Sequence, residues 1–211
     1  GAAVGDAADD ASGMRVLNGL RPHQIAQAGV SRTFQNIRLF KDLTVLENVR
    51  VAQHFHAGYN PLQAILRTPR QRRRETELDA KALELLAIFR LDGKAGESAR
   101  NLPYGEQRKL EIARALATGP RLLLLDEPAA GMNPQETQGL MDLIRFIRDR
   151  FSLTILLIEH DMRLVMGICE KITVLDYGSV IAVGSPAEIS RNPQVIKAYL
   201  GEEVQGDAAN L

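Results

Sequence analysis

The stretch from Leu122 to Met132 constrains the fold more than any other part of the chain. Four leucines run directly into Asp126, Glu127 and Pro128. A short apolar run bounded by residues that break secondary structure is typical of a fully buried strand, which favours a parallel sheet. Carboxylates at the carboxyl end of such a strand lie where open α/β sheets bind ligands. The simpler alternative is a buried strand followed by a solvated acidic turn.

The two adjacent acids favour a role in phosphate chemistry. Asp126 can hold Mg²⁺, because this ion binds through one or two carboxylates and completes its shell with water and phosphate oxygens. Glu127 can polarise an attacking water molecule. The sequence therefore predicts a metal-binding acid and a water-activating acid side by side.

Two further polar side chains follow predicted strands. Gln35 comes after the β-branched and aromatic residues of the strand predicted from Val30, and its amide can offer an oxygen to a metal and N–H groups to a phosphate. The apolar run from Leu153 to Ile158 ends at Glu159 and His160, and a histidine can donate to a phosphate oxygen or orient a water. A surface glutamine and a capping histidine are the ordinary alternatives for each residue taken singly.

The helix predicted from Leu102 to Ala117 is a further candidate part of the site. Its first turn contains Tyr104, Gly105, Glu106 and Gln107, whose backbone N–H groups lie at the positive end of the helix dipole. Such an end is a ready anion site, and Gly105 lets a phosphate approach the backbone. Any glycine before any helix shares this property, so the pattern is weak when it stands alone.

The remaining elements complete a mixed α/β pattern. Helices are predicted over 22–28, 44–53, 75–89 and 134–151, after Ser185 and over 193–200, with a hairpin over 172–184. Asn133 fits the cap of the helix that Pro134 opens. We expect residues 44–102 to form a small helical subdomain, residues 1–19 to be a disordered or remnant segment, and residues 202–211 to be a tail.

Charge and composition exclude several classes of function. Lys plus Arg and Asp plus Glu number 26 each, so no global field favours nucleic acid or anionic lipid. No apolar run reaches the roughly 18 residues of a membrane span, so a membrane role would act through a partner. The five arginines of 67–74 suit a solvated helix end, and the alternatives are contact with phospholipid head groups or with an acidic face of a partner. His54 and His56 have no third metal ligand nearby.

The ordered set of motifs resembles the ATP-binding subunits of ABC transporters. Gln35 matches the Q-loop, Leu102 to Gln107 the signature motif, Leu122 to Glu127 the Walker B strand, Asn133 the end of the D-loop and His160 the H-loop. Several segments resemble more specifically the cytoplasmic ATPases of branched-chain amino acid importers. The segments that carry this closer resemblance are RTFQNIRLF at 32–40, DEPAAGMNP at 126–134, LLIEHDM at 156–162 and NPQVIKAYLG at 192–201.

This resemblance implies a fold and a set of roles. The fold is α/β, a P-loop-type ABC ATPase core over residues 20–201 with a helical subdomain, its N-terminal strands and phosphate loop missing. Asp126 would hold Mg²⁺, Gln35 would touch the ion or the water, and Glu127 and His160 would be catalytic. Residues 104–107 and Asn133 would contact ATP.

The resemblance also implies partners and a location. The partners would be a second ABC ATPase subunit, in a homodimer or a heterodimer, and transmembrane permease subunits. A periplasmic amino-acid-binding protein would act indirectly, and no nucleic acid is expected. The expected location is cytoplasmic and peripheral, on the inner face of the plasma membrane.

The chain departs from the family pattern in several places, one of which is Asn133, where the D-loop more usually has aspartate, although the importer subgroup often has asparagine there. No G-x-x-x-x-G-K-[ST] phosphate loop occurs in it, and Leu17-Asn18-Gly19 has neither the lysine nor a second glycine. Pro103 stands where the general signature has serine. We expect a chain lacking its N-terminal portion, with a Walker B strand short of one neighbour. The alternatives are a catalytically inactive binding partner and a soluble ABC protein outside transport.

Overall fold

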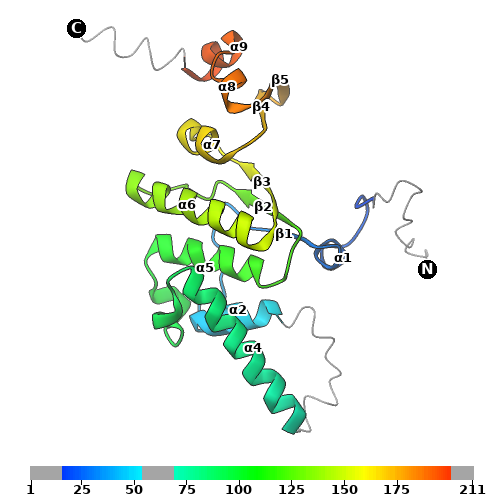
Figure 1. The fold of residues 1–211 in the computed structure, drawn as a ribbon, viewed down its shortest axis with the longest axis vertical. Coiled ribbons are helices and arrows are strands. Elements are labelled where there is room, and N and C mark those ends of the chain that lie inside the picture. The colour runs from blue at the N-terminus through cyan, green and yellow to red at the C-terminus, as the bar shows by residue number, and fades with distance from the viewer. Residues whose placement is uncertain (1–15, 54–68, 201–211) are drawn as a thin grey trace. The chain divides into compact units, whose positions relative to one another are not determined.

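The computed structural model describes residues 16–53 and 69–200, which fall into two compact units (Figure 1). Unit 1 contains the described residues up to Met132 together with Phe146–Ile158, and unit 2 contains Asn133–Arg145 and the described residues from Glu159 onward. The predictions for residues 1–15, for His54 and His56 and for the tail at 202–211 lie outside the described residues.

Unit 1 is built on a three-stranded parallel sheet. Its strands are β1 (Val30–Arg32), β2 (Leu122–Asp126) and β3 (Thr154–Ile158), in the order β1-β2-β3. Arg32 pairs with Leu124, and Asp126 pairs with Ile158. All three strands were predicted near these positions, and their carboxyl ends meet at one edge because they are parallel.

The prediction that the acidic strand lacks a neighbour is wrong. β2 lies between β1 and β3, so its N–H and C=O groups have partners on both sides. Within the part of the chain that the structure describes, it is the two outer strands, β1 and β3, that pair along one edge only. Leu123 and Leu125 of β2 are buried, whereas Leu122 and Leu124 are half-buried. The strand is therefore covered completely on one face and partly on the other.

Helices form much of the remainder of unit 1, and two of them contact strand β1. They are α1 (Pro22–Gln27), α2 (Val45–Gln53), α4 (Pro69–Ile88) and α5 (Tyr104–Leu116), with short 3₁₀ turns at Asp92–Lys94 and Ala99–Asn101. α4 begins six residues before the predicted start, at Pro69, because proline is favoured in the first turn of a helix, where its missing N–H costs nothing.

α2, α4 and α5 pack against one another. The side chains of Val49, Leu86 and Leu110 are fully buried, one from each helix. Thr44 and Glu47 form the predicted capping box of α2, because the Glu47 side chain accepts from the Thr44 N–H at 2.8 Å and the Glu47 N–H donates to the Thr44 hydroxyl at 3.1 Å. The proposed boundaries of the ATPase domain and of its helical subdomain stay predictions.

Unit 2 has its own small core. It contains most of α6 (Pro134–Phe151), which ends in unit 1, followed by α7 (Met162–Ile168), the hairpin strands β4 (Ile172–Asp176) and β5 (Ser179–Gly184), α8 (Pro186–Ile189), α9 (Pro193–Val195) and a π turn at Ile196–Leu200. The buried apolar cluster comprises Val165, Ile172, Val174, Ala182, Ile189 and Val195.

The hairpin follows its sequence pattern. Tyr177 and Gly178 have φ angles of 43° and 80°, which suit the two-residue turn that matches the twist of antiparallel strands. None of the helices in the described residues is both long and apolar enough to cross a membrane.

Candidate functional site

The carboxyl edge of the unit 1 sheet brings Gln35 and Glu127 into contact. The Thr33 N–H donates to the Leu124 carbonyl at 2.9 Å, which continues the pairing of β1 with β2 one residue beyond β1. Gln35 Nε2 then donates to Glu127 Oε2 at 2.7 Å. Two side chains that lie 92 positions apart in the sequence therefore meet where the parallel strands end.

Asp126 is ion-paired with Arg32, a residue that the motif search did not single out. Arg32 Nη2 lies 2.7 Å from Asp126 Oδ2, and the two side chains are 53% and 21% exposed. At that exposure the pair adds little to stability. The strand register explains this contact, because Arg32 pairs with Leu124 and so lies diagonally beside Asp126 on the same face.

Glu127 has an unusual backbone conformation. Its φ angle is 43°, in the left-handed region that residues other than glycine rarely adopt. Its N–H donates to the Ile158 carbonyl at 2.9 Å, so the turn is fixed to the end of β3. Strained residues of this kind concentrate at functional sites.

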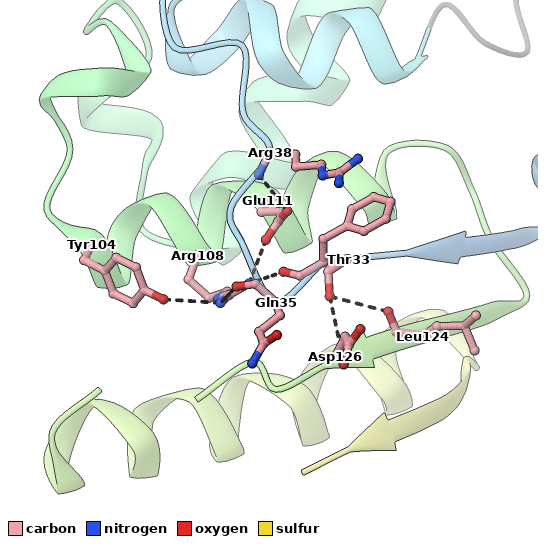
Figure 2. Close-up of polar contacts among 9 residues, drawn as sticks. Thr33, Gln35, Arg38, Tyr104, Arg108, Glu111, Leu124 and Asp126 are labelled. Atoms are coloured by element: carbon pink, nitrogen blue, oxygen red, sulfur yellow. Dashed lines mark hydrogen bonds and ion pairs between the residues drawn. The ribbon is translucent and has the colours of Figure 1, made fainter. Parts of the chain in front are cut away.

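Helix α5 contacts the segment that carries Gln35 through a buried ion pair (Figure 2). Arg108 and Glu111, one helical turn apart, are 0% and 1% exposed and lie 2.9 Å from each other. The Arg108 guanidinium donates to the carbonyls of Phe34 and Gln35 at 2.6 and 2.7 Å. Sequence analysis missed this pair, since single charged residues on a helix ordinarily face solvent.

The first turn of α5 differs from the prediction. The N–H groups of Glu106 and Gln107 donate to the Pro103 carbonyl at 3.0 and 2.9 Å, so two of the four expected anion donors already have acceptors. The reason is that a helix satisfies its own N–H groups from the third or fourth position onward. The expectation of a free N–H is therefore wrong for these two residues and stays a prediction for Tyr104 and Gly105.

The side chains of this turn are also in use within the chain. Lys94 Nζ contacts both carboxylate oxygens of Glu106 at 2.7 and 2.6 Å, and this hydrogen bond raises the pKa of Lys94. Gln107 Nε2 donates to the Leu102 carbonyl at 2.8 Å, and the Tyr104 hydroxyl lies 3.3 Å from Arg108 Nη2. Contacts of these residues with a nucleotide stay predictions.

The two remaining candidates lie in unit 2. Asn133 is the predicted helix cap, because its Oδ1 accepts from the Glu136 N–H and its own N–H donates to Glu136 Oε2, both at 2.9 Å. The His160 side chain is 73% exposed, whereas that of Glu159 is 1% exposed. Asp161 caps α7 by accepting from Arg163 N–H at 2.9 Å. The roles of Asn133 and His160 toward ATP stay predictions.

The donors at the sheet edge suit a hard cation. Asp126 offers a carboxylate and Gln35 an amide oxygen, and both are oxygen ligands of the kind that Mg²⁺ prefers. In the described residues, no group of three or more His, Cys, Asp or Glu side chains could hold a metal ion. This donor set fits an ion that is held by one or two protein groups and otherwise by substrate oxygens and water.

The family models and the solved structure that match this chain are all of ABC transporters. The family model described as "ABC transporter" matches residues 8–130, and that described as "Branched-chain amino acid ATP-binding cassette transporter" matches residues 179–205. A crystal structure of the ADP conformation of an ATP-binding cassette of an ABC transporter superposes with a TM-score of 0.70 at 28% identity, covering 88% of this chain and 73% of that one.

Two individual relatives are similar to this chain in sequence. The high-affinity branched-chain amino acid transport ATP-binding protein BraF of Pseudomonas aeruginosa is 52% identical over 186 residues, which are 88% of this chain and 73% of the relative. LivG of Escherichia coli, which has the same description, is 50% identical with the same coverage.

The fold is that of an ABC-type ATPase, a class whose members hydrolyse ATP as subunits of transporters. Within that class, this chain belongs to the branched-chain amino acid ATP-binding cassette transporter family.

Proposed function

We propose that this chain is the ATP-hydrolysing subunit of an importer of branched-chain amino acids. The contact between Gln35 and Glu127 at the carboxyl edge of the sheet is the observation that supports it most directly. The similarity to BraF and LivG supports the choice of cargo. Such a subunit works as a dimer with membrane permeases, at the cytoplasmic face of the membrane, and a periplasmic binding protein delivers the amino acid.

The site residues then divide the chemistry among them. Glu127 accepts a proton from the attacking water, and Gln35 holds that carboxylate in place at 2.7 Å. Asp126 and Gln35 would hold Mg²⁺, which when bound would offset the charge of the phosphates. His160 donates to the terminal phosphate. The signature turn from Tyr104 to Gln107 and Asn133 contact the nucleotide across the dimer.

A second candidate function is a binding partner that does not hydrolyse ATP. Pro103 favours it, because this residue caps α5 without a side-chain hydrogen bond where a serine hydroxyl could have faced a phosphate. The soluble, non-transport alternative has less support, since the similar proteins are transport subunits.

The two candidates are separated by ATP hydrolysis of the native polypeptide isolated with its membrane partners. Glu127→Gln should lower kcat by about 10²–10⁴-fold and leave ATP binding intact, because general-base catalysis contributes about that much. Glu84→Gln, on the exposed surface of α4, is the matched control and should hydrolyse ATP normally. A native protein that copurifies with permease subunits but does not hydrolyse ATP would favour the second candidate.

A further inference from the structure

The segment from Thr33 to Phe40 has no helix or strand beyond the end of β1, so its shape depends on what binds its backbone. Gln35 lies near the start of this segment and contacts Glu127. Any group that fixes the backbone here therefore also fixes the Gln35 side chain relative to the acidic turn.

Two side chains of α5 bind this backbone on both sides of Gln35. Arg108 donates to the carbonyls of Phe34 and Gln35, and Glu111 Oε1 accepts the Arg38 N–H at 3.1 Å (Figure 2). Glu111 Oε2 at the same time accepts from Arg108 Nη1 at 2.9 Å. One ion pair thus supplies donors to one end of the five-residue stretch 34–38 and an acceptor to the other.

Burying this ion pair costs free energy, and the packing of the fold alone does not explain why the pair is there. Both side chains are almost completely buried, and a buried ion pair often stabilises a fold less than apolar residues of the same size. Arg108 Nε is also buried, and no acceptor in the described residues lies within hydrogen-bonding distance of it. Polar groups buried at such a cost need an explanation in terms of positioning or function.

We propose that Arg108 and Glu111 are positioning residues that hold Gln35 in its contact with Glu127. The planar guanidinium binds two successive carbonyls with donors in a fixed relative geometry, which the rotatable donors of an ammonium group do not impose. A shift of α5 must therefore move the backbone at 34–38 or break several buried hydrogen bonds together. The mechanical link rests on geometry within unit 1, and its consequence for hydrolysis rests on the proposed function.

Asn48 provides a matched control within the same segment. It is fully buried, and it holds Phe40 through Oδ1 and Nδ2, each at 3.0 Å. It thus binds the far end of the segment, away from Gln35. A role limited to stabilising the fold would make the two sites equivalent, whereas the proposed role concerns Gln35 only through Arg108 and Glu111.

The test uses amide hydrogen exchange and the side-chain amide signals of Gln35 in the 211-residue chain, so it does not depend on ATP hydrolysis. The double variant Arg108→Met/Glu111→Leu replaces the ion pair by apolar groups of similar size. Exchange of the Arg38 amide should become about tenfold faster or more, and the Gln35 side-chain signals should shift. Asn48→Ala should speed exchange at Phe40 and leave the Gln35 signals in place.

Arg108→Lys is a second variant that keeps the buried charge pair and loses only the fork. It should shift the Gln35 signals and leave the Arg38 amide protected by Glu111. The proposal is overturned if the Gln35 signals stay unchanged in a folded Arg108→Lys variant. It is equally overturned if Asn48→Ala moves these signals as much as the variants of the pair do.

Discussion

At the residue scale, the backbone of Glu127 allows a direct test of stored strain. Its φ of 43° costs a side-chain-bearing residue about 1–2 kcal/mol, and glycine adopts the same angle freely. Glycine also makes the unfolded chain more flexible, which returns about 0.5–1 kcal/mol. We therefore expect Glu127→Gly to unfold with a free energy about 0.5–1 kcal/mol above that of Glu127→Ala, as measured by urea denaturation.

Glu127→Ala is the proper reference for this prediction because both variants lose the contact with Gln35. Equal stability of the two variants, or a more stable alanine variant, would show that the turn is not strained.

Cys169 leads to a second prediction at this scale. It is the chain's single cysteine, and its partial burial raises the pKa of its thiol. The reactive form is the thiolate, so a raised pKa means less of it at neutral pH. Alkylation of the native chain at pH 7.5 should be slower than that of the urea-unfolded chain. The rate should still be rising above the pH at which the unfolded chain levels off.

Sequence reasoning at the residue scale found the acids but not the groups that contact them. Asp126 and Glu127 stand out because a breaker follows an apolar run, and Gln35 because it follows a strand. Arg32 was missed because its partner Asp126 is 94 positions away, and Arg108 and Glu111 were missed because the backbone groups that they bind are 73 or 74 positions away. Only the strand register and the packing of α5 make those partners neighbours.

At the element scale, the capping box of α2 predicts a pH dependence. Hydrogen bonds from the backbone and side chain of Thr44 lower the pKa of Glu47 in the folded state. A lowered folded pKa means that the charge of Glu47 stabilises the fold above its unfolded pKa of about 4.3 and that this contribution is lost as the pH falls through the folded pKa.

Glu47→Gln keeps the oxygen acceptor of this capping box and removes the charge. Its free energy of unfolding should fall below that of the parent chain at pH 7 and converge with it in the acid range. Denaturation at pH 7, 5 and 3 measures this difference. A gap that stays constant down to pH 3 would contradict the assignment of the pKa shift to Glu47.

Most of the helices and strands were predictable, because capping residues and turn residues mark where they begin and end. Thr44, Asn133 and Ser185 each precede a helix, and the Tyr177-Gly178 turn sits between two β-branched runs. The start of α4 was misjudged because arginine-rich sequence with a proline suggests a break, whereas proline in a first turn is compatible with a helix.

At the scale of the whole molecule, the outer strand β3 of the unit 1 sheet, whose exposed side chains are large and apolar, predicts self-association. Within the described residues β3 pairs only with β2, and Leu156 and Ile158 are 56% and 57% exposed. Exposed apolar strand edges favour pairing with other chains. Leu156→Lys should therefore severalfold reduce the aggregated fraction of the 211-residue chain in sedimentation experiments.

Val51→Lys is the control for this prediction, because Val51 is a 44% exposed apolar residue on helix α2 rather than on a strand. If both variants reduced aggregation equally, net charge rather than the β3 edge would be responsible.

The order of the motifs along the whole chain indicated the class of protein correctly, since widely separated polar residues follow successive strands. The strand order was not predictable from that pattern. The sequence favoured a missing neighbour for the acidic strand, whereas hydrogen bonding places β3 beside it. Long-range pairing depends on how the strands twist and pack together, which local patterns do not specify.

The ion pair of Arg32 with Asp126 has a consequence for how a cation would enter the site. Two adjacent carboxylates at a sheet edge would repel each other, but here one has a counter-ion from its own chain and the other a hydrogen-bond donor. A cation that binds Asp126 Oδ2 would therefore have to displace the Arg32 guanidinium, so that its arrival and the release of Arg32 would form a single exchange.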